Sequence, residues 1–204
     1  LVTDRSFRVR LLRVTWIDSD ERRGRMVRNA FLIEQRNRLA DRTGLERIDI
    51  DSAIVEELDP EHLNLASMFQ YLVGNFDFSP IAGSDGECCH NYEMYADGSG
   101  AWIAIPFDFD FSGLVNAPNA VPNREQGVDR VGQRVYHGYC ENNAYLDGSI
   151  TRYREARDRI YALVAGQEEL EPAVRESIAR YLDGFYAVID DPAELQEKIT
   201  GACR

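Results

Sequence analysis

The order of apolar and polar positions divides the N-terminal part of the chain into two strands and a short helix. Residues 7–17 alternate between apolar and polar side chains, which predicts a strand. An arginine-rich turn follows around Gly24, and the apolar run "NAFLIEQ" (29–35) predicts a second strand. The next residues predict a short helix that ends at Gly44. One face of the first strand carries Phe7, Val9 and Leu11.

The middle of the chain predicts a helix followed by a hairpin. Over residues 61–73 apolar side chains recur every three or four positions, so we expect a helix with one buried face that ends at Gly74. Strands are then predicted over 91–96 and 101–108, with a glycine-containing turn between them. The remaining segments are an expected loop over 112–128 and helices over about 144–165, 171–189 and 193–200.

Strands and helices are segregated along the chain instead of alternating, which favours an α+β fold over a doubly wound sheet. We expect residues 61–200 to form a mainly helical lobe whose only clear hairpin spans 91–108. The first two strands are expected to form a separate, incomplete sheet.

Composition narrows the classes of partner. The chain has 204 residues, 44% hydrophobic and 28% charged, which is typical of a folded globular protein. Its net charge of −12 argues against non-specific binding to nucleic acid and against docking on anionic lipid. Its apolar runs are shorter than the ~18 residues that a membrane-spanning helix needs. Lys198 is the only lysine, so the other 22 of the 23 basic residues are arginine.

Neither the first residue nor the cysteines determine in which cellular compartment the protein is found. The sequence begins at Leu1 without an initiator methionine, so we expect a piece of a longer protein, either exported or cytoplasmic. Cys88, Cys89, Cys140 and Cys203 include no CxxC pair and match no zinc-binding spacing. Adjacent cysteines rarely bridge each other, but either Cys88 or Cys89 could reach Cys140.

Two aspartates lie in one of the most apolar stretches of the chain. In "IAIPFDFDFSGLV" (103–115), Asp108 and Asp110 are flanked by phenylalanines, and burying an unpaired carboxylate is costly. Asp77 lies just after the predicted helix, and Asn91 begins the predicted hairpin. If the helix end and the hairpin pack together, their carboxylate and amide oxygens form a site that suits Mg²⁺ or Mn²⁺. The metal would supply the missing countercharge.

The same residues carry a resemblance to a known family. A helix, then "N-x-D" (75–77), then Asn91, then an apolar strand ending in "DFD" resembles the core of atypical protein-kinase-like enzymes. The branch concerned includes HipA, the spore-coat kinase CotH and the type II phosphatidylinositol 4-kinases. The resemblance covers roughly residues 29–115. It implies that Asp77 is the catalytic residue that positions the acceptor hydroxyl, and that Asn91 and Asp108 bind the metals that bridge the phosphates of ATP.

The resemblance also implies how the chain divides. Residues 1–35 correspond to the last strands of an N-lobe with its hinge, and residues 36–204 to a kinase-like, mainly helical C-lobe whose β-hairpin carries the metal site. Backbone groups of Ile33, Glu34 and Gln35 are then expected to face the adenine of ATP. A glycine-rich loop and a phosphate-binding lysine are expected upstream of this sequence.

Two functions follow from this interpretation. The first is an ATP- and Mg²⁺- or Mn²⁺-dependent phosphotransferase whose acceptor is a protein, a lipid or a small molecule. The second is a non-catalytic pseudokinase that binds nucleotide, metal or a partner protein.

Structural and chemical alternatives compete with both functions. Asp77 could simply end its helix with Asn75 as a left-handed cap, and Asn91 and His90 could be ordinary strand-entry residues. A calcium loop that begins at Asp108 is disfavoured, because Asn119 occupies the position of its bidentate acid. A phosphatase with a DxD nucleophile is disfavoured, because no lysine lies between that motif and the acidic pair 190–191.

Overall fold

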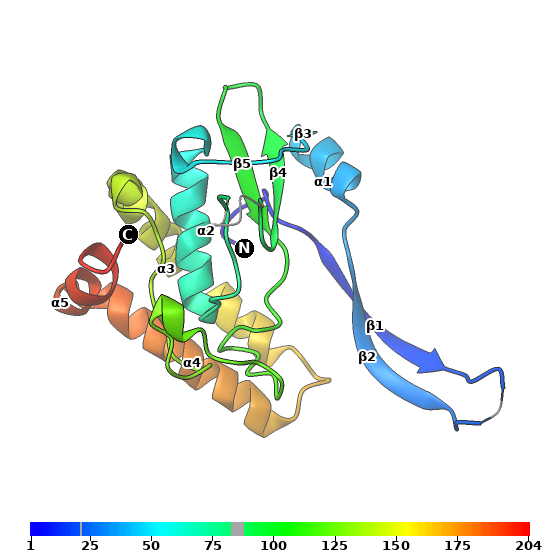
Figure 1. Cartoon of the computed structure of the whole chain (residues 1–204). Helices are drawn as coiled ribbons and strands as arrows, with labels where there is room; N and C mark the ends of the chain where they lie inside the picture. Colours follow the sequence, from blue (N-terminus) through cyan, green and yellow to red (C-terminus); the bar gives the residue numbers. More distant parts are fainter. Residues whose placement is uncertain (21, 83–87) are drawn as a thin grey trace.

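Two antiparallel strands near the N-terminus form a long ribbon that extends away from the rest of the molecule (Figure 1). The computed structural model describes residues 1–20, 22–82 and 88–204. The ribbon consists of β1 (Val9–Trp16) and β2 (Met26–Ile33), and every residue of the two strands is exposed or only half-buried. These strands form a sheet of their own, as the sequence predicted.

Two helices begin and end where the sequence predicted. α1 (Arg36–Thr43) ends at Gly44, whose φ of 70° lies in the left-handed region that glycine adopts readily. α2 (Pro60–Val73) begins after Asp59, whose carboxylate accepts a backbone hydrogen bond from the first turn at 2.7 Å. It ends at Gly74, which is also left-handed, with a φ of 63°.

A second sheet lies in the body of the molecule with the strand order β3-β4-β5. It consists of β3 (Glu46–Arg47), β4 (Tyr92–Ala96) and β5 (Trp102–Pro106). β4 and β5 form the predicted hairpin, but β5 ends at Pro106 instead of reaching Asp108. The pairing ends here because the partner strand does: Asn91, just before β4, has a left-handed backbone with a φ of 60°. β3 was not predicted, because two residues are too few to show a period.

The β4–β5 hairpin is covered by a helix on each face. On one face, Tyr95 and Ile103 pack against Leu39 of α1, and all three side chains are fully buried. On the other face, Met94 and Ala104 pack against α2. Successive residues of a strand point to opposite faces, so a hairpin covered twice needs apolar residues at nearly every position.

α2 is the central helix, and the prediction of a single buried face is wrong. The hairpin packs on one side of it, where Leu63 and Ala66 lie. The C-terminal helices pack on the other side, against Leu65, Met68 and Leu72. A helix covered by two layers is buried nearly all round, which the helical period alone cannot reveal.

The C-terminal half supplies the predicted helices. α3 (Leu146–Ala165) and α4 (Pro172–Asp190) pack against α2, and α5 (Pro192–Leu195) leads into a π-helical turn at Gln196–Thr200. The expected loop over 112–128 contains one 3₁₀ turn, and the 3₁₀ helices are Val55–Glu57, Arg124–Gln126 and Cys140–Tyr145. Within the described parts of the chain, no helix has the length and apolar character needed to cross a membrane.

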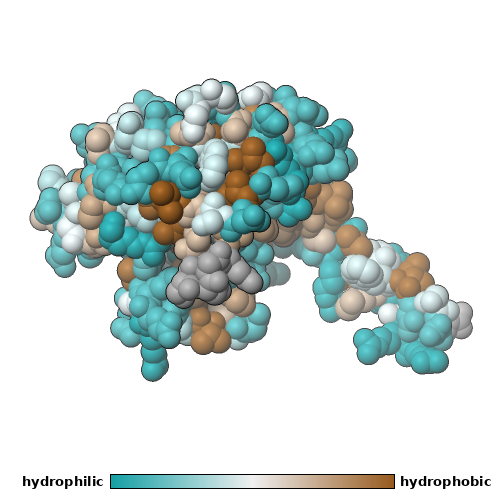
Figure 2. Space-filling view, turned by 45° about the horizontal axis from the view of Figure 1, so that its top comes forward, coloured by the Kyte–Doolittle hydropathy of each residue, from teal (hydrophilic) through white to brown (hydrophobic). Residues whose placement is uncertain are grey.

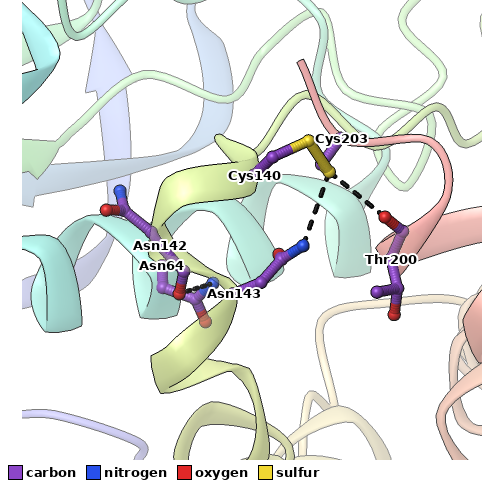
Figure 3. The surroundings of a disulfide bond; sticks show 6 residues. All are labelled: Asn64, Cys140, Asn142, Asn143, Thr200 and Cys203. Atoms are coloured by element: carbon purple, nitrogen blue, oxygen red, sulfur yellow. Dashed lines mark hydrogen bonds between the residues drawn. A yellow bond between two sulfur atoms is a disulfide. The ribbon is translucent and has the colours of Figure 1, made fainter.

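A disulfide links the C-terminus to the start of the helical region (Figure 3). Cys140 pairs with Cys203, and Cys88 pairs with Cys89, so the prediction that Cys88 or Cys89 could reach Cys140 is wrong. The backbone explains the choice. The Cys140 N–H donates to the Arg204 carbonyl at 3.1 Å, which places Cys203 beside Cys140.

Candidate active site

The segment that follows α2 brings Asp77 to the start of β4. The Asn91 side-chain amide donates to the Asp77 backbone carbonyl at 2.7 Å and to its carboxylate at 3.2 Å. His90 Nε2 lies 2.9 Å from the other carboxylate oxygen of Asp77 and donates to it when Nε2 carries the proton. Asp77 and Asn91, which the sequence placed in one site, are therefore in direct contact.

Asn75 connects this pair to the segment that carries Asp108. The side-chain oxygen of Asn75 accepts a hydrogen bond from the Asp77 N–H at 3.2 Å, and its amide nitrogen donates to the Asp108 carbonyl at 3.3 Å. Asn75 is only 2% exposed. One buried side chain thus fixes the backbone of both predicted acidic residues.

A network of buried polar side chains holds Asn75 in place. Its amide nitrogen also donates to Gln70 Oε1 at 3.0 Å, and the Gln70 amide donates to the Tyr92 hydroxyl at 3.3 Å. Gln70 and Tyr92 come from α2 and β4, and both are buried. Burial raises the pKa of the Tyr92 hydroxyl well above its usual value. The network ties the helix, the turn after it and the hairpin into one unit, because each buried polar group needs its partner.

Asp108 lies two residues past the end of β5. The Phe107 N–H donates to the Asn91 carbonyl at 3.2 Å, which continues the hairpin pairing by one residue and leaves Asp108 one residue beyond the partner of Asn91. One carboxylate oxygen of Asp108 accepts from the Asp110 N–H at 3.2 Å. Asp108 is half-buried, whereas Asp110 is exposed, so the expectation of two buried carboxylates in this run is wrong for Asp110.

Asn91 and Asp108 each have an oxygen atom of the kind that a hard divalent metal prefers. The contacts of Asn91 with Asp77 use the amide nitrogen, so its amide oxygen takes no part in them. The second carboxylate oxygen of Asp108 is likewise outside the bond with Asp110. Such oxygens suit Mg²⁺ or Mn²⁺, with water and phosphate oxygens completing the coordination. Among the residues with described positions, no cluster of three or more His, Cys, Asp or Glu side chains offers a protein-only cage.

The residues after Asp108 are fastened to the end of α2. The Gly113 N–H donates to the Gly74 carbonyl, and the Leu114 N–H to the Val73 carbonyl, both at 2.9 Å. The hydroxyl of Tyr181 from α4 lies against both glycines, and a Cβ would lie 2.4 Å from it at Gly113 and 2.0 Å at Gly74. The backbone can approach this closely only because both residues lack a side chain.

A cleft of about 560 Å³ lies beside this constellation. Its walls include Ile33, Glu34 and Gln35, the three residues expected to face adenine, and Phe107, which directly precedes Asp108. The volume falls in the range of about 300–1,000 Å³ that is typical of small-molecule sites. The predicted nucleotide residues thus line the cleft, whereas Asp77, Asn91 and Asp108 are not among its lining residues, and Phe107 connects the cleft to Asp108.

The backbone groups of the three adenine-facing residues are only partly available. The Glu34 N–H donates to the Arg8 carbonyl at 2.8 Å, and the Gln35 carbonyl accepts from the Leu39 N–H at 3.1 Å. In an antiparallel ladder, hydrogen-bonded and non-hydrogen-bonded pairs alternate, so the backbone groups of Ile33 point away from β1. Of the three residues, Ile33 is therefore the one best placed to offer backbone contacts to a base.

Sequence reasoning missed three residues that build the site. Gln70 was passed over inside an apolar helix, Asn75 was interpreted as a helix cap, and His90 as a strand-entry residue. A polar side chain in an otherwise apolar stretch, such as Gln70 in "LASMFQYLV" (65–73), is the signal that could have revealed the network.

Comparisons with known proteins assign neither a family nor a function to this chain. The chain matches no protein-family model, no curated protein and no solved structure.

Proposed function

We propose that the protein is an ATP- and divalent-metal-dependent phosphotransferase of the atypical kinase-like type. The observation that carries this proposal is the bridge through Asn75, which joins the backbone of Asp77 to that of Asp108. A merely structural helix end would not need a buried amide that fixes two acidic segments far apart in sequence. The α+β fold agrees with the proposal at a coarser level.

Each residue of the site has a separate role in the proposed phosphoryl transfer. Asp77 is 32% exposed at the surface of the site, where its carboxylate can accept a hydrogen bond from an acceptor hydroxyl and hold it in line with the γ-phosphate. Asn91 and His90 hold that carboxylate in place. Asn91 and Asp108 would hold Mg²⁺ or Mn²⁺ through their oxygens. When bound, the metal neutralises charge on the phosphate oxygens.

Substitutions in the site test the proposal. Asp77→Asn keeps the size of the side chain but removes the accepting charge, so ATP affinity should stay within about two-fold while turnover falls roughly 10²–10⁴-fold. Asp108→Ala should abolish Mn²⁺-dependent ATP binding. Asp110→Ala is the matched control, because its exposed carboxylate lies two residues away. The measurements are transfer of labelled γ-phosphate to added acceptors or to the protein itself, and ATP binding by calorimetry with and without Mn²⁺.

The results separate the roles. Wild-type activity in Asp77→Asn would remove Asp77 from its catalytic assignment, and unchanged ATP affinity in Asp108→Ala would remove the metal assignment. These assays use the full-length protein, which is expected to carry the phosphate-binding lysine upstream of this sequence. The phosphotransferase proposal fails if the full-length wild type binds ATP but transfers no phosphoryl or nucleotidyl group to any acceptor.

The second candidate is a pseudokinase that binds nucleotide, metal or a partner protein. The single lysine of this sequence, Lys198, lies in the C-terminal π-helical turn and pairs with Glu194, so it does not line the cleft. A phosphate-binding lysine on a strand upstream of this sequence would favour the phosphotransferase over the pseudokinase. ATP binding without transfer would support this alternative.

A further inference from the structure

The cleft contains two arginines that share one carboxylate. Arg36, the first residue of α1, lies 2.5 Å from Glu93 of β4, and Arg47 of β3 lies 3.5 Å from the other oxygen of the same carboxylate. Arg36, Arg47 and Glu93 all line the cleft. Three elements that are distant in sequence therefore bring two guanidinium groups to one wall of a ligand-sized cavity.

Each arginine of this wall has a carboxylate partner. Glu34, the other acidic residue of the cleft, is bound by Arg42 at 2.9 Å, and hydrogen bonds from Arg42 hold the pKa of its carboxyl below the usual value. Arg47 contacts Asp49 at 2.7 Å as well as Glu93, but the Asp49 side chain is 81% exposed, and a surface ion pair contributes little. Glu93 is therefore the carboxylate that lies between Arg36 and Arg47 in the cleft.

Arg36 retains donors for a ligand, whereas the three side-chain nitrogens of Arg47 all contact carboxylate oxygens of Glu93 and Asp49. The contact with Glu93 uses the Nη2 side of Arg36, and the side chain of Arg36 is 54% exposed. A guanidinium carries five N–H donors in a planar fork that matches two oxygens of a phosphate group. Glu93 presents two oxygens to the two arginines in the way that a phosphate would.

The position of the wall links it to the candidate metal site. Phe107 lines the same cleft as Arg36, Arg47 and Glu93, and it directly precedes Asp108 in the sequence. The wall therefore lies in the cleft that the Asp108 segment borders.

We propose that Arg36 and Arg47 form the polyphosphate-binding site of the cleft and that Glu93 occupies this site as an internal carboxylate until a phosphate displaces it. The ligand class is a nucleoside triphosphate or another linear polyphosphate, held by guanidinium groups where related chemistry commonly uses an ammonium group. The inference rests on the proposed function for the identity of the nucleotide, but the arginine wall itself is a feature of the cleft.

Binding measurements test this site without any catalytic readout. Inorganic tripolyphosphate, ATP and adenosine are titrated by calorimetry into the wild type and into Arg36→Ala, Arg47→Ala and Glu93→Gln, each in the presence of Mg²⁺. Each arginine substitution should weaken tripolyphosphate and ATP about ten-fold or more, because a charge-assisted contact is lost. Adenosine affinity should not change. Glu93→Gln should strengthen tripolyphosphate binding several-fold, because the competing charge is removed.

Two controls exclude a general effect of charge or of unfolding. Arg38→Ala removes the same charge from an exposed position of α1 that does not line the cleft, and it should bind all three ligands like the wild type. Arg36→Lys keeps the charge but loses the fork, so it should recover only part of the lost affinity. Thermal melting confirms that each variant is folded.

The outcomes distinguish this inference from the proposed function. Unchanged tripolyphosphate affinity in both Arg36→Ala and Arg47→Ala, or an equal loss in Arg38→Ala, overturns the arginine site even if phosphoryl transfer is observed. Arginine-dependent binding of ATP and tripolyphosphate by a full-length protein that transfers no phosphoryl group supports the arginine site and removes the phosphotransferase.

Discussion

The two hairpins of this protein are both antiparallel but have opposite surroundings. β4–β5 lies between α1 and α2, and Tyr95 and Ile103 are 0% exposed. β1–β2 is longer, but Leu11 and Phe31, which lie opposite each other on one face, are 61% and 62% exposed. Hydrophobic residues are visible on the surface of the ribbon where it extends from the body (Figure 2).

This difference shows that apolar alternation specifies a strand but not its burial. A two-stranded hairpin is marginally stable in water unless something packs on it. β4–β5 has a helix on each face, and the buried network of Gln70, Asn75 and Tyr92 ties it to α2. The ribbon is fastened mainly at its base, where Arg42 binds Glu34 and the backbone of the N-terminal segment. The candidate site lies at the covered hairpin.

The largest expected difference between the hairpins is in the loss of folding stability when one isoleucine is replaced by alanine in or beside each of them. Ile103→Ala removes a fully buried side chain and should destabilise the protein by about 2–5 kcal/mol. Ile17→Ala, beside β1 at the far end of the ribbon, removes a side chain that is 79% exposed and should change stability by less than about 0.5 kcal/mol. Urea denaturation measures both. Equal losses would mean that the ribbon is packed in solution.

A smaller difference in stability is expected when each of two glycines is replaced by alanine. Gly113→Ala places a Cβ 2.4 Å from the Tyr181 hydroxyl and 2.7 Å from the Val131 carbonyl, so overpacking should cost about 1–3 kcal/mol. Gly24→Ala, in the turn of the ribbon, has open space around its Cβ and should be nearly neutral. Adding Tyr181→Phe should restore part of the stability of Gly113→Ala. No restoration would show that the carbonyl contact dominates the cost.

The smallest expected effect is a pH dependence located beside the covered hairpin. Burial lowers the pKa of His62, which contacts the backbone of Ala104 in β5, to about 4. The unfolded chain, with a histidine pKa near 6.5, therefore binds a proton first as the pH falls, and stability is lost from about pH 6.5 downward. At pH 6 the loss from this residue should be about 0.8 kcal/mol relative to pH 8.

Comparison of His62→Gln with the wild type checks this pH dependence. The variant should have a lower stability at pH 8 but a smaller loss between pH 8 and pH 6 in urea titrations. His137, whose pKa burial also lowers to about 4, should contribute similarly and remains in the variant. An identical pH dependence in His62→Gln and wild type would show that His62 titrates normally.

The sequence predicted elements well because their signals are local. Gly44 and Gly74 end their helices as expected, and the hairpin over 91–108 needs only the pattern of its own residues. The contact of Asp77 with Asn91 was also predicted, because each lies at the end of an element that must pack against the other.

The rest depends on contacts between distant segments, which no local pattern records. Asn75 is important because of the Asp108 carbonyl, 33 residues away. Glu93 is important because α1 and β3 bring arginines to it. Cys140 pairs with Cys203 because the last residues of the chain return to it, which the spacing of the cysteines does not encode. The kinase-like interpretation itself stays a prediction.

The disulfide between Cys140 and Cys203 also determines how the molecule would carry mechanical tension. The bond closes a ring, 63 residues apart in sequence, that contains α3, α4 and α5 (Figure 3). A force applied between the two ends of the chain passes from one sulfur to the other and bypasses these helices. The fully stretched chain should be shorter by about 220 Å than the reduced chain, at roughly 3.5 Å per residue. The three C-terminal helices would bear load only after reduction.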